Sequence, residues 1–243
     1  MKCFIRKLLL LIFFLAVAKV NAQVLNSGVS GNATTNLLGR LETDVIQQKP
    51  DLVVMMIGTN DMLNSKKMLT YKEYENNLVK IIQRIKDTGA KVVLMSSPPV
   101  DSIYLFERHD RKLFKETPNV KMDSVRKIQQ RLAQKMQLHS INLYQKFVDM
   151  NLPKHDEDLF FKSIINSKAR DGVHLTSLGY HFIGQTVFQY LNVNKLLSKD
   201  QKIICFGDSI TFGAGVKTGG SVNGESYPAI LNKLKNELFS PKE

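Results

Sequence analysis

The sequence has very few cysteines, with only Cys3 and Cys205 among its 243 residues. Because Cys3 lies in an N-terminal segment that we expect to be removed, a single cysteine remains. One cysteine excludes an internal disulfide, although export would permit one. Cys205 falls in the apolar run Ile203–Phe206, which is typical of a buried strand. We therefore predict a small core residue rather than a reactive thiol.

Long apolar runs are also absent, and the longest, Leu8–Ala18, is too short to span a bilayer as a helix. Three basic residues precede it, and Val20-Asn21-Ala22 has small residues at the spacing that signal peptidase requires. This pattern predicts a signal peptide over residues 1–22, cleaved near Ala22. The mature protein is then secreted or periplasmic, without stable membrane insertion. An uncleaved N-terminal anchor is the alternative.

The charge is basic but not clustered. The formal net charge of +12 falls to +8 without the four basic residues of the signal segment. Acidic residues are interleaved with the remaining cations, and no basic stripe with stacking aromatics appears. This excludes a nucleic-acid binder of the usual kind and leaves mild attraction to acidic polysaccharide or anionic membrane surface. The oligomeric state is left open.

The sequence offers no clear metal site. His109-Asp110 and His155-Asp156 are the candidate pairs, but no third ligand follows at a zinc-like spacing. The glycine-rich stretch Gly213–Gly220 lacks the order of a phosphate-binding loop. We expect it to be a flexible loop beside the site, and we predict no cofactor and no metal.

Short apolar runs alternate with amphipathic segments along the chain, so we predict one α/β domain over residues 23–243. Near-continuous apolar strands are typical of a parallel sheet covered on both faces. The predicted strands are Val24–Asn26, Leu52–Ile57, Lys91–Met95, Ser140–Leu143 and Lys202–Phe206. The predicted helices are Thr35–Gln48, Tyr71–Lys86, Asp123–Met136, Leu178–Leu191 and Tyr227–Leu238.

Functional sites in such sheets form at the carboxyl ends of the strands. Gly207-Asp208-Ser209-Ile210-Thr211 follows the last predicted strand, Gly28–Asn32 the first and Gly58-Thr59-Asn60-Asp61 the second. Asp171-Gly172-Val173-His174 precedes a predicted helix. These segments contain a nucleophile, a base, an acid and several hydrogen-bond donors.

Each residue type suits acyl transfer. His174 can remove the Ser209 proton, and Asp171 can hold the imidazole in the useful tautomer. The Asn60 amide and the backbone N–H groups of Gly31 and Ser209 can stabilise an oxyanion. Asp208 and Asp61 are expected to support the backbone around Ser209 and Asn60, and Thr176 or Ser177 to cap the helix after His174.

The four segments resemble the conserved blocks of the SGNH (GDSL) hydrolase superfamily. The resemblance assigns Ser209 as nucleophile, Gly31 and Asn60 to the oxyanion hole with Ser209, and Asp171 and His174 as the rest of the triad. It implies a three-layer α/β/α flavodoxin-like fold with a five-stranded parallel sheet, hydrolysis of carboxylic esters or thioesters, and no cofactor.

One departure from the family is large, because the serine block comes last rather than first. We interpret the chain as a circular permutant in which residues 192–201 join the old termini at a surface loop. The alternative is a remnant of a tandem array, in which the first domain lacks its serine block and the second domain is truncated. Permutation predicts that the last strand lies between the first two, and that Ser209, His174 and Asn60 converge at one edge.

The sequence indicates the substrate less clearly than the reaction. Two long segments, Pro98–Thr117 and Asn151–Arg170, are expected to shape specificity. The first carries aromatic and basic residues that suit a sugar or polar ester: Tyr104, Phe106, Arg108, His109 and Arg111. A solvated loop with no such role is the alternative. The resemblance extends to carbohydrate O-acetyl esterases such as those acting on acetylated xylan. A lysophospholipase or acyl-thioesterase, and a catalytically dead glycan-binding module, are the other candidates.

Overall fold

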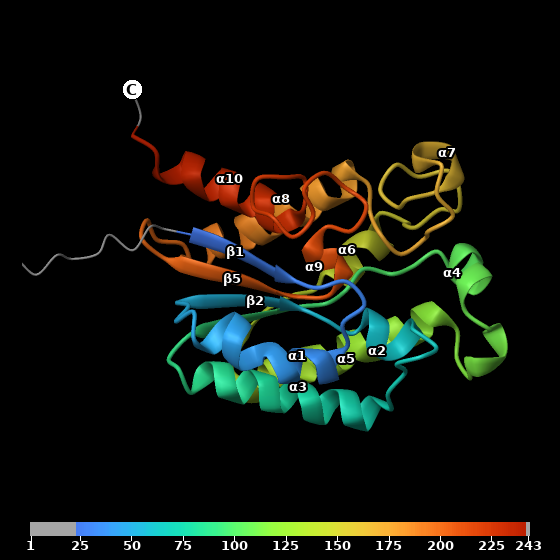
Figure 1. Ribbon diagram of the computed structural model, residues 1–243, viewed down its shortest axis with the longest axis horizontal. Coiled ribbons are helices and arrows are strands. Elements are labelled where there is room, and N and C mark those ends of the chain that lie inside the picture. The colour runs from blue at the N-terminus through green and yellow to red at the C-terminus, as the bar shows by residue number, and fades with distance from the viewer. Residues whose placement is uncertain (1–22, 242–243) are drawn as a thin grey trace, which may run out of the picture.

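The computed structural model describes residues 23–241, so the predicted signal peptide over residues 1–22 lies outside the described residues. Five parallel strands form one sheet in the order β1-β5-β2-β3-β4. The strand that comes last in the chain therefore pairs with β1 on one side and β2 on the other, as predicted (Figure 1). The strands are β1 Gln23–Gly28, β2 Leu52–Met56, β3 Lys91–Met95, β4 His139–Ile141 and β5 Lys202–Gly207.

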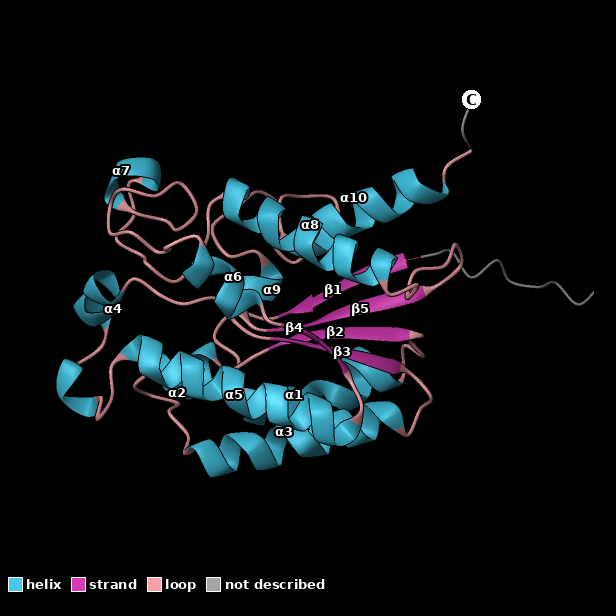
Figure 2. Cartoon of the chain, turned by 180° about the vertical axis from the view of Figure 1, so that it is seen from behind, coloured by secondary structure: helices cyan, strands magenta, loops and turns pink. Residues whose placement is uncertain are grey.

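Helices cover both faces of the sheet and give the predicted three layers (Figure 2). One face packs against α1 Thr34–Leu41, α3 Tyr71–Lys86 and α5 Pro118–Met136, and the other against α6 Leu143–Asp149, α8 Ser177–Val193 and α10 Tyr227–Phe239. Shorter helical segments are η1 Glu42–Ile46, α2 Thr59–Leu63, α4 Ser102–Arg108, η2 Arg111–Leu113, α7 Ile164–Ser167 and α9 Ser209–Phe212.

The alternation of side chains along β2 divides the core between these two layers. Val53 and Met55 join the cluster on the α1, α3 and α5 side. Leu52, Val54 and Met56 join the cluster formed with α8 and α10. All five residues are fully buried, which is why this strand reads as an unbroken apolar run.

Local capping explains where the helix boundaries differ from the sequence prediction. Helix α5 begins at Pro118 rather than Asp123, because proline fits the first turn, where its missing N–H costs nothing. The predicted strand ending at Leu143 stops at Ile141, because the Asn142 side chain accepts a hydrogen bond from the Gln145 N–H at 3.1 Å and starts α6.

The connection predicted over residues 192–201 is shorter than expected, because α8 continues to Val193. Its remaining residues are tied to the fold. Leu196 is buried, and the Lys235 Nζ of α10 donates to the Lys199 carbonyl at 3.1 Å. This segment therefore leads directly from the end of α8 into the central strand.

Cys205 has the predicted place in the core. It is fully buried in β5, and burial raises the pKa of its thiol to about 12. A thiol with so high a pKa is protonated at neutral pH and unreactive.

Candidate active site

Ser209 begins the short helix α9 where β5 ends. The Asp208 carboxylate caps this helix by accepting the Ile210 N–H at 2.9 Å. Because β5 is central in the sheet, Ser209 lies between the segments that follow β1 and β2. The residue is 7% exposed, and its Oγ lies 2.9 Å from His174 Nε2.

His174 and Asp171 share the turn that leads into α8. His174 Nδ1 is 2.8 Å from Asp171 Oδ2, and the Asp171 carboxylate also accepts the N–H groups of Val173 and His174 at 3.0 and 2.8 Å. Burial by itself would raise the pKa of Asp171, but hydrogen bonds and charge from His174 hold that pKa well below its ordinary value. An ionised Asp171 favours the Nδ1–H tautomer, which leaves the Nε2 lone pair facing Ser209.

The turn itself is held from both sides by backbone hydrogen bonds. The Asp101 N–H donates to the Gly172 carbonyl at 2.8 Å, and the Lys162 N–H donates to the His174 carbonyl at 3.0 Å. Gly172 has a φ of +67°, and a Cβ there would lie 2.9 Å from Asp101. Only glycine satisfies both constraints, so the Asp171–His174 geometry depends on Gly172.

The expected oxyanion donors gather beside Ser209. Asn60 lies in the first turn of α2, where its Oδ1 accepts from Asn64 Nδ2 at 3.2 Å and its Nδ2 donates to the Asn32 carbonyl at 3.0 Å. Within residues 23–241, the N–H groups of Gly31 and Ser209 donate to no protein acceptor. Gly31 has a φ of +76°, and a Cβ there would meet nothing within 4 Å. Glycine is therefore favoured at this position by the backbone conformation rather than by crowding.

A cavity of about 220 Å³ connects these residues. Ser209, His174, Asn60 and Gly31 all line it, so the structure brings the predicted residues together at one edge of the sheet. The rest of the lining is partly apolar and partly polar: Leu63, Leu105, Val173, Ala214, Ser30, Thr59, Asn64, Arg108 and His109.

Comparison with known proteins decides the family. The sequence matches the GDSL-like lipase/acylhydrolase family over residues 14–182, more than half of its length. The chain belongs to this family. This family match, together with relatives that are named as esterases, places the chain among the carboxylic ester hydrolases.

Three curated relatives illustrate the likeness. The lipoprotein YqeF of Bacillus subtilis is 24% identical over 67% of this chain and 71% of its own. An arylesterase of Vibrio mimicus is 43% identical over 31% of this chain, and an acetylxylan esterase of Geobacillus stearothermophilus is 35% identical over 32%. The matched segments span only 36% and 39% of those two esterases.

Solved structures show the same fold. A lipase/acylhydrolase from Enterococcus faecalis aligns with a TM-score of 0.54 and 26% identity, covering 70% of this chain and 75% of its own. A catalytic mutant of Axe2, an acetylxylan esterase from Geobacillus stearothermophilus, aligns with a TM-score of 0.54 and 21% identity, covering 68% and 69%. The predicted SGNH fold with its five-stranded parallel sheet is confirmed.

Two buried carboxyl groups, those of Asp61 and Asp208, form hydrogen bonds with the backbone near Asn60 and Ser209. Asp61 Oδ1 accepts from the N–H of Thr34 at 2.9 Å and from its hydroxyl, which anchors the start of α1 to α2. Asp208 is fully buried. Each carboxyl has one buried oxygen, Oδ2, without a hydrogen-bond partner among the described residues. Both residues thus organise backbone next to Ser209 and Asn60.

Burial raises the pKa of the Asp208 carboxyl to about 7. An unfolded aspartate releases its proton near pH 4. Between those values the folded state holds a proton that the unfolded state has lost, so the free energy of unfolding falls as pH rises through this window.

We expect the free energy of unfolding of Asp208→Asn to fall less between about pH 4 and pH 7 than that of the unchanged protein. Asparagine keeps the acceptor for the Ile210 N–H and carries no charge. Melting temperature followed by circular dichroism from pH 4.5 to 8 measures the effect. The exposed Asp200→Asn is the control. An unchanged pH dependence in Asp208→Asn would contradict the assignment.

Two cations near the site make contacts that the sequence did not predict. Arg108, at the end of α4, donates from Nη2 to the Asp171 carbonyl, and the same nitrogen is 3.6 Å from Asp171 Oδ1. Lys67 Nζ donates to the Gly31 carbonyl at 2.7 Å. Arg108 belongs to a segment expected to shape specificity, and in the fold it both lines the cavity and contacts the acid of the proposed triad. These contacts join segments distant in sequence, so no local pattern reports them.

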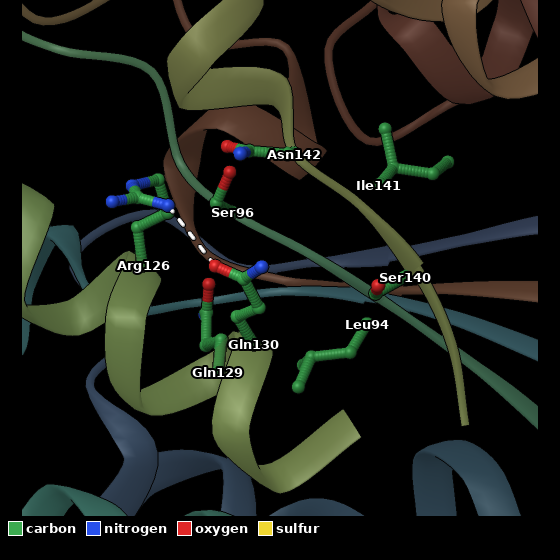
Figure 3. A pocket seen from close by; sticks show the side chains of 8 residues that line it. All are labelled: Leu94, Ser96, Arg126, Gln129, Gln130, Ser140, Ile141 and Asn142. Atoms are coloured by element: carbon green, nitrogen blue, oxygen red, sulfur yellow. Dashed lines mark hydrogen bonds between the residues drawn. The ribbon is translucent and has the colours of Figure 1, made fainter. Parts of the chain in front are cut away.

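A second cavity in the described structure lacks this combination of residues. A cavity of about 80 Å³ beside β3, β4 and α5 contains an Arg126–Gln130 hydrogen bond of 3.2 Å, and none of the predicted site residues lines it (Figure 3). Residues 23–241 contain no cluster of three or more histidine, cysteine or acidic side chains suited to a metal ion. Thr176 caps α8 as expected, accepting the Gly179 N–H at 3.3 Å.

Proposed function

We propose that the protein hydrolyses esters through Ser209, His174 and Asp171. The observation that carries this proposal is the hydrogen-bonded series Ser209 Oγ, His174 Nε2 and Nδ1, and Asp171 Oδ2 beside a cavity. Structures of Axe2 catalytic mutants, in which a serine, an aspartate or a histidine is replaced, support the same three residue types.

In the first half-reaction Ser209 Oγ attacks the ester carbonyl while His174 Nε2 takes its proton. The tetrahedral intermediate collapses to an acyl-serine, and His174 returns the proton to the departing alcohol. Water then attacks the acyl-serine with His174 again as the base, which releases the acid and restores Ser209. Asp171 stays ionised and stabilises the imidazolium that forms in each half.

The oxyanion of each tetrahedral intermediate is assigned to Gly31 N–H, Ser209 N–H and Asn60 Nδ2. Two of these donors have no protein acceptor in the described residues, and the third is oriented by Asn32 and Asn64. Donors fixed before the reaction need no reorganisation as charge develops, so they lower the barrier more than mobile donors would.

We expect Asn60→Ala to lower kcat by about 10²- to 10³-fold, the usual cost of one oxyanion donor. KM should change little, because the lost hydrogen bond forms mainly in the transition state. Steady-state hydrolysis of 4-nitrophenyl acetate measures both constants, with the exposed Asn192→Ala as the control. A rise in KM at unchanged kcat would instead assign Asn60 to ground-state binding.

The substrate we propose is a carbohydrate carrying O-acetyl groups. The cavity of about 220 Å³ is smaller than a typical pocket for a drug-sized ligand, and its polar side chains suit a sugar better than a long acyl chain. The acetylxylan esterase among the relatives supports the same acyl group.

Release of acetate from acetylated xylooligosaccharides tests this proposal, run beside a lysophospholipid and an acyl-thioester. We expect acetate release to exceed the other two activities in kcat/KM by at least about tenfold. A preference for the long acyl chains would favour the lysophospholipase or thioesterase alternative. Hydrolysis of none of them would favour a binding module.

We also propose that the chain is a circularly permuted member of the family. In Axe2 the replaced serine precedes the aspartate and histidine, whereas Ser209 follows Asp171 and His174 here. The family match ends at residue 182, before the serine block. The position of β5 between β1 and β2 supports the same interpretation.

An extracytoplasmic location is proposed from the signal-like residues 1–22 and from the likeness to a lipoprotein. In the part of the chain that the structure describes, no helix has the length and hydropathy needed to cross a membrane.

A further inference from the structure

One wall of the active-site cavity presents hydrogen-bond donors and cations. It is formed by Asn64, Arg108 and His109. Lys66 does not line the cavity, but its backbone N–H donates to Asn64 and its charge acts on His109. We name these four residues the donor wall. No aspartate or glutamate lines the cavity. Arginine and lysine side chains only donate hydrogen bonds, whereas a sugar hydroxyl both donates and accepts, so a wall of donors favours a ligand rich in acceptors.

The acceptor atoms of Asn64 and His109 already accept hydrogen bonds from the protein. Asn64 Oδ1 accepts the Lys66 N–H at 3.2 Å, and Asn64 Nδ2 donates to Asn60. His109 Nδ1 accepts the Ser65 N–H at 3.4 Å and lies 3.0 Å from the Ser65 hydroxyl. Since Nδ1 is an acceptor, the proton of neutral His109 is on Nε2, which can donate to a ligand.

Arg108 contributes the strongest donors. One nitrogen, Nη2, contacts Asp171, whereas Nε and Nη1 have no acceptor among residues 23–241. The side chain is 39% exposed and lines the cavity. A guanidinium with free N–H groups matches the two oxygens of a carboxylate.

The charges that act on His109 are both positive, whereas the ionised Asp171 carboxylate lies 3.6 Å from Arg108 and is not part of the cavity lining. Burial, Arg108 and Lys66 together lower the pKa of His109, so both cations act on that ring. Lys67, bound to the Gly31 carbonyl, places a further ammonium next to the cavity. An anionic group entering beside Ser209 would meet this positive field.

We propose that the donor wall binds a carboxylate on the substrate, so that the preferred esters are acetylated sugars containing uronic acid. This inference rests on the proposed function. It adds a charged determinant on the sugar to the acetyl group that Ser209 would attack.

The test compares kcat/KM for acetylated galacturonic acid oligosaccharides with kcat/KM for acetylated xylooligosaccharides. We expect a preference of about tenfold or more for the acidic substrate at low salt, because charge-assisted hydrogen bonds are strong. The preference should fall several-fold in Lys66→Glu and on raising the salt from 20 to 200 mM. Lys80→Glu, an exposed change on α3, is the control and should leave the preference unchanged.

A binding measurement separates this inference from the proposed function. Calorimetry of Ser209→Ala with trigalacturonic acid and with xylotriose needs no catalysis, and we expect only the acid to bind measurably. Equal kcat/KM for both substrates, with no binding of trigalacturonic acid, would overturn the donor wall and leave the esterase proposal intact. Binding of the acid by a protein that hydrolyses no ester would overturn the proposed function and support the donor wall.

Discussion

Replacing Ser209 by alanine is expected to lower kcat for 4-nitrophenyl acetate by about 10⁴-fold or more, the scale seen when a serine nucleophile is removed. The hydroxyl oxygen is the atom that would form the acyl intermediate, and within residues 23–241 Ser209 is the side chain that His174 Nε2 contacts. The fold should survive, because the substitution removes one oxygen at the start of α9 while the Asp208 cap stays in place. Hydrolysis rates and melting temperature measure the two effects.

Ser97→Ala is the matched control, because the Ser97 hydroxyl is also buried at a strand end and has no partner in the described structure. It should retain the activity of the unchanged protein. The double variant Ser209→Ala with His174→Ala should be hardly slower than Ser209→Ala, since residues that act as a unit are not additive. A Ser209→Ala variant with more than a tenth of the original activity would remove Ser209 from its proposed role.

Deletion of residues 196–243 is expected to abolish both folding and activity. The deletion removes β5, which among the described residues is the one strand paired with β1 and one of two paired with β2. It also removes α10, which packs on the same layer as α8. Buried residues on both faces of the sheet would then be exposed to water. Each Å² of exposed apolar surface lowers the free energy of unfolding by about 25 cal/mol. Circular dichroism, cooperative unfolding and ester hydrolysis measure the outcome.

A rearranged chain tests whether the order of the segments matters. In it, residues 202–241 precede residues 23–201 through a Gly/Ser linker of about 15 residues, which reaches about 20 Å as a flexible coil. Figure 1 shows the end of α10 and the start of β1 at the same end of the sheet. We expect this variant to fold and to keep activity within about tenfold, because every strand pair is retained. A stable, active 23–195 fragment, or a rearranged chain that does not fold, would contradict the permutation proposal.

Much of the fold was predictable because its signals are local. Helix α3 has the predicted bounds, since Thr70 and Glu73 form a capping box and apolar residues follow at helical spacing. Strand β3 likewise has the predicted bounds. The short helices α2, α4 and α7 were not predicted, because each has too few residues to show a periodic pattern.

The sequence alone determined the residue types and spacings that identify the family, and it placed Asp171 three residues before His174. That spacing acts within one turn, so it needs no distant partner. Tertiary structure decided the rest of the site. Ser209 meets His174 only because β5 enters the centre of the sheet, and Arg108 contacts Asp171 only because α4 packs over that turn. Contacts between segments far apart in the chain depend on packing, and no local pattern records which of them the folded protein will form.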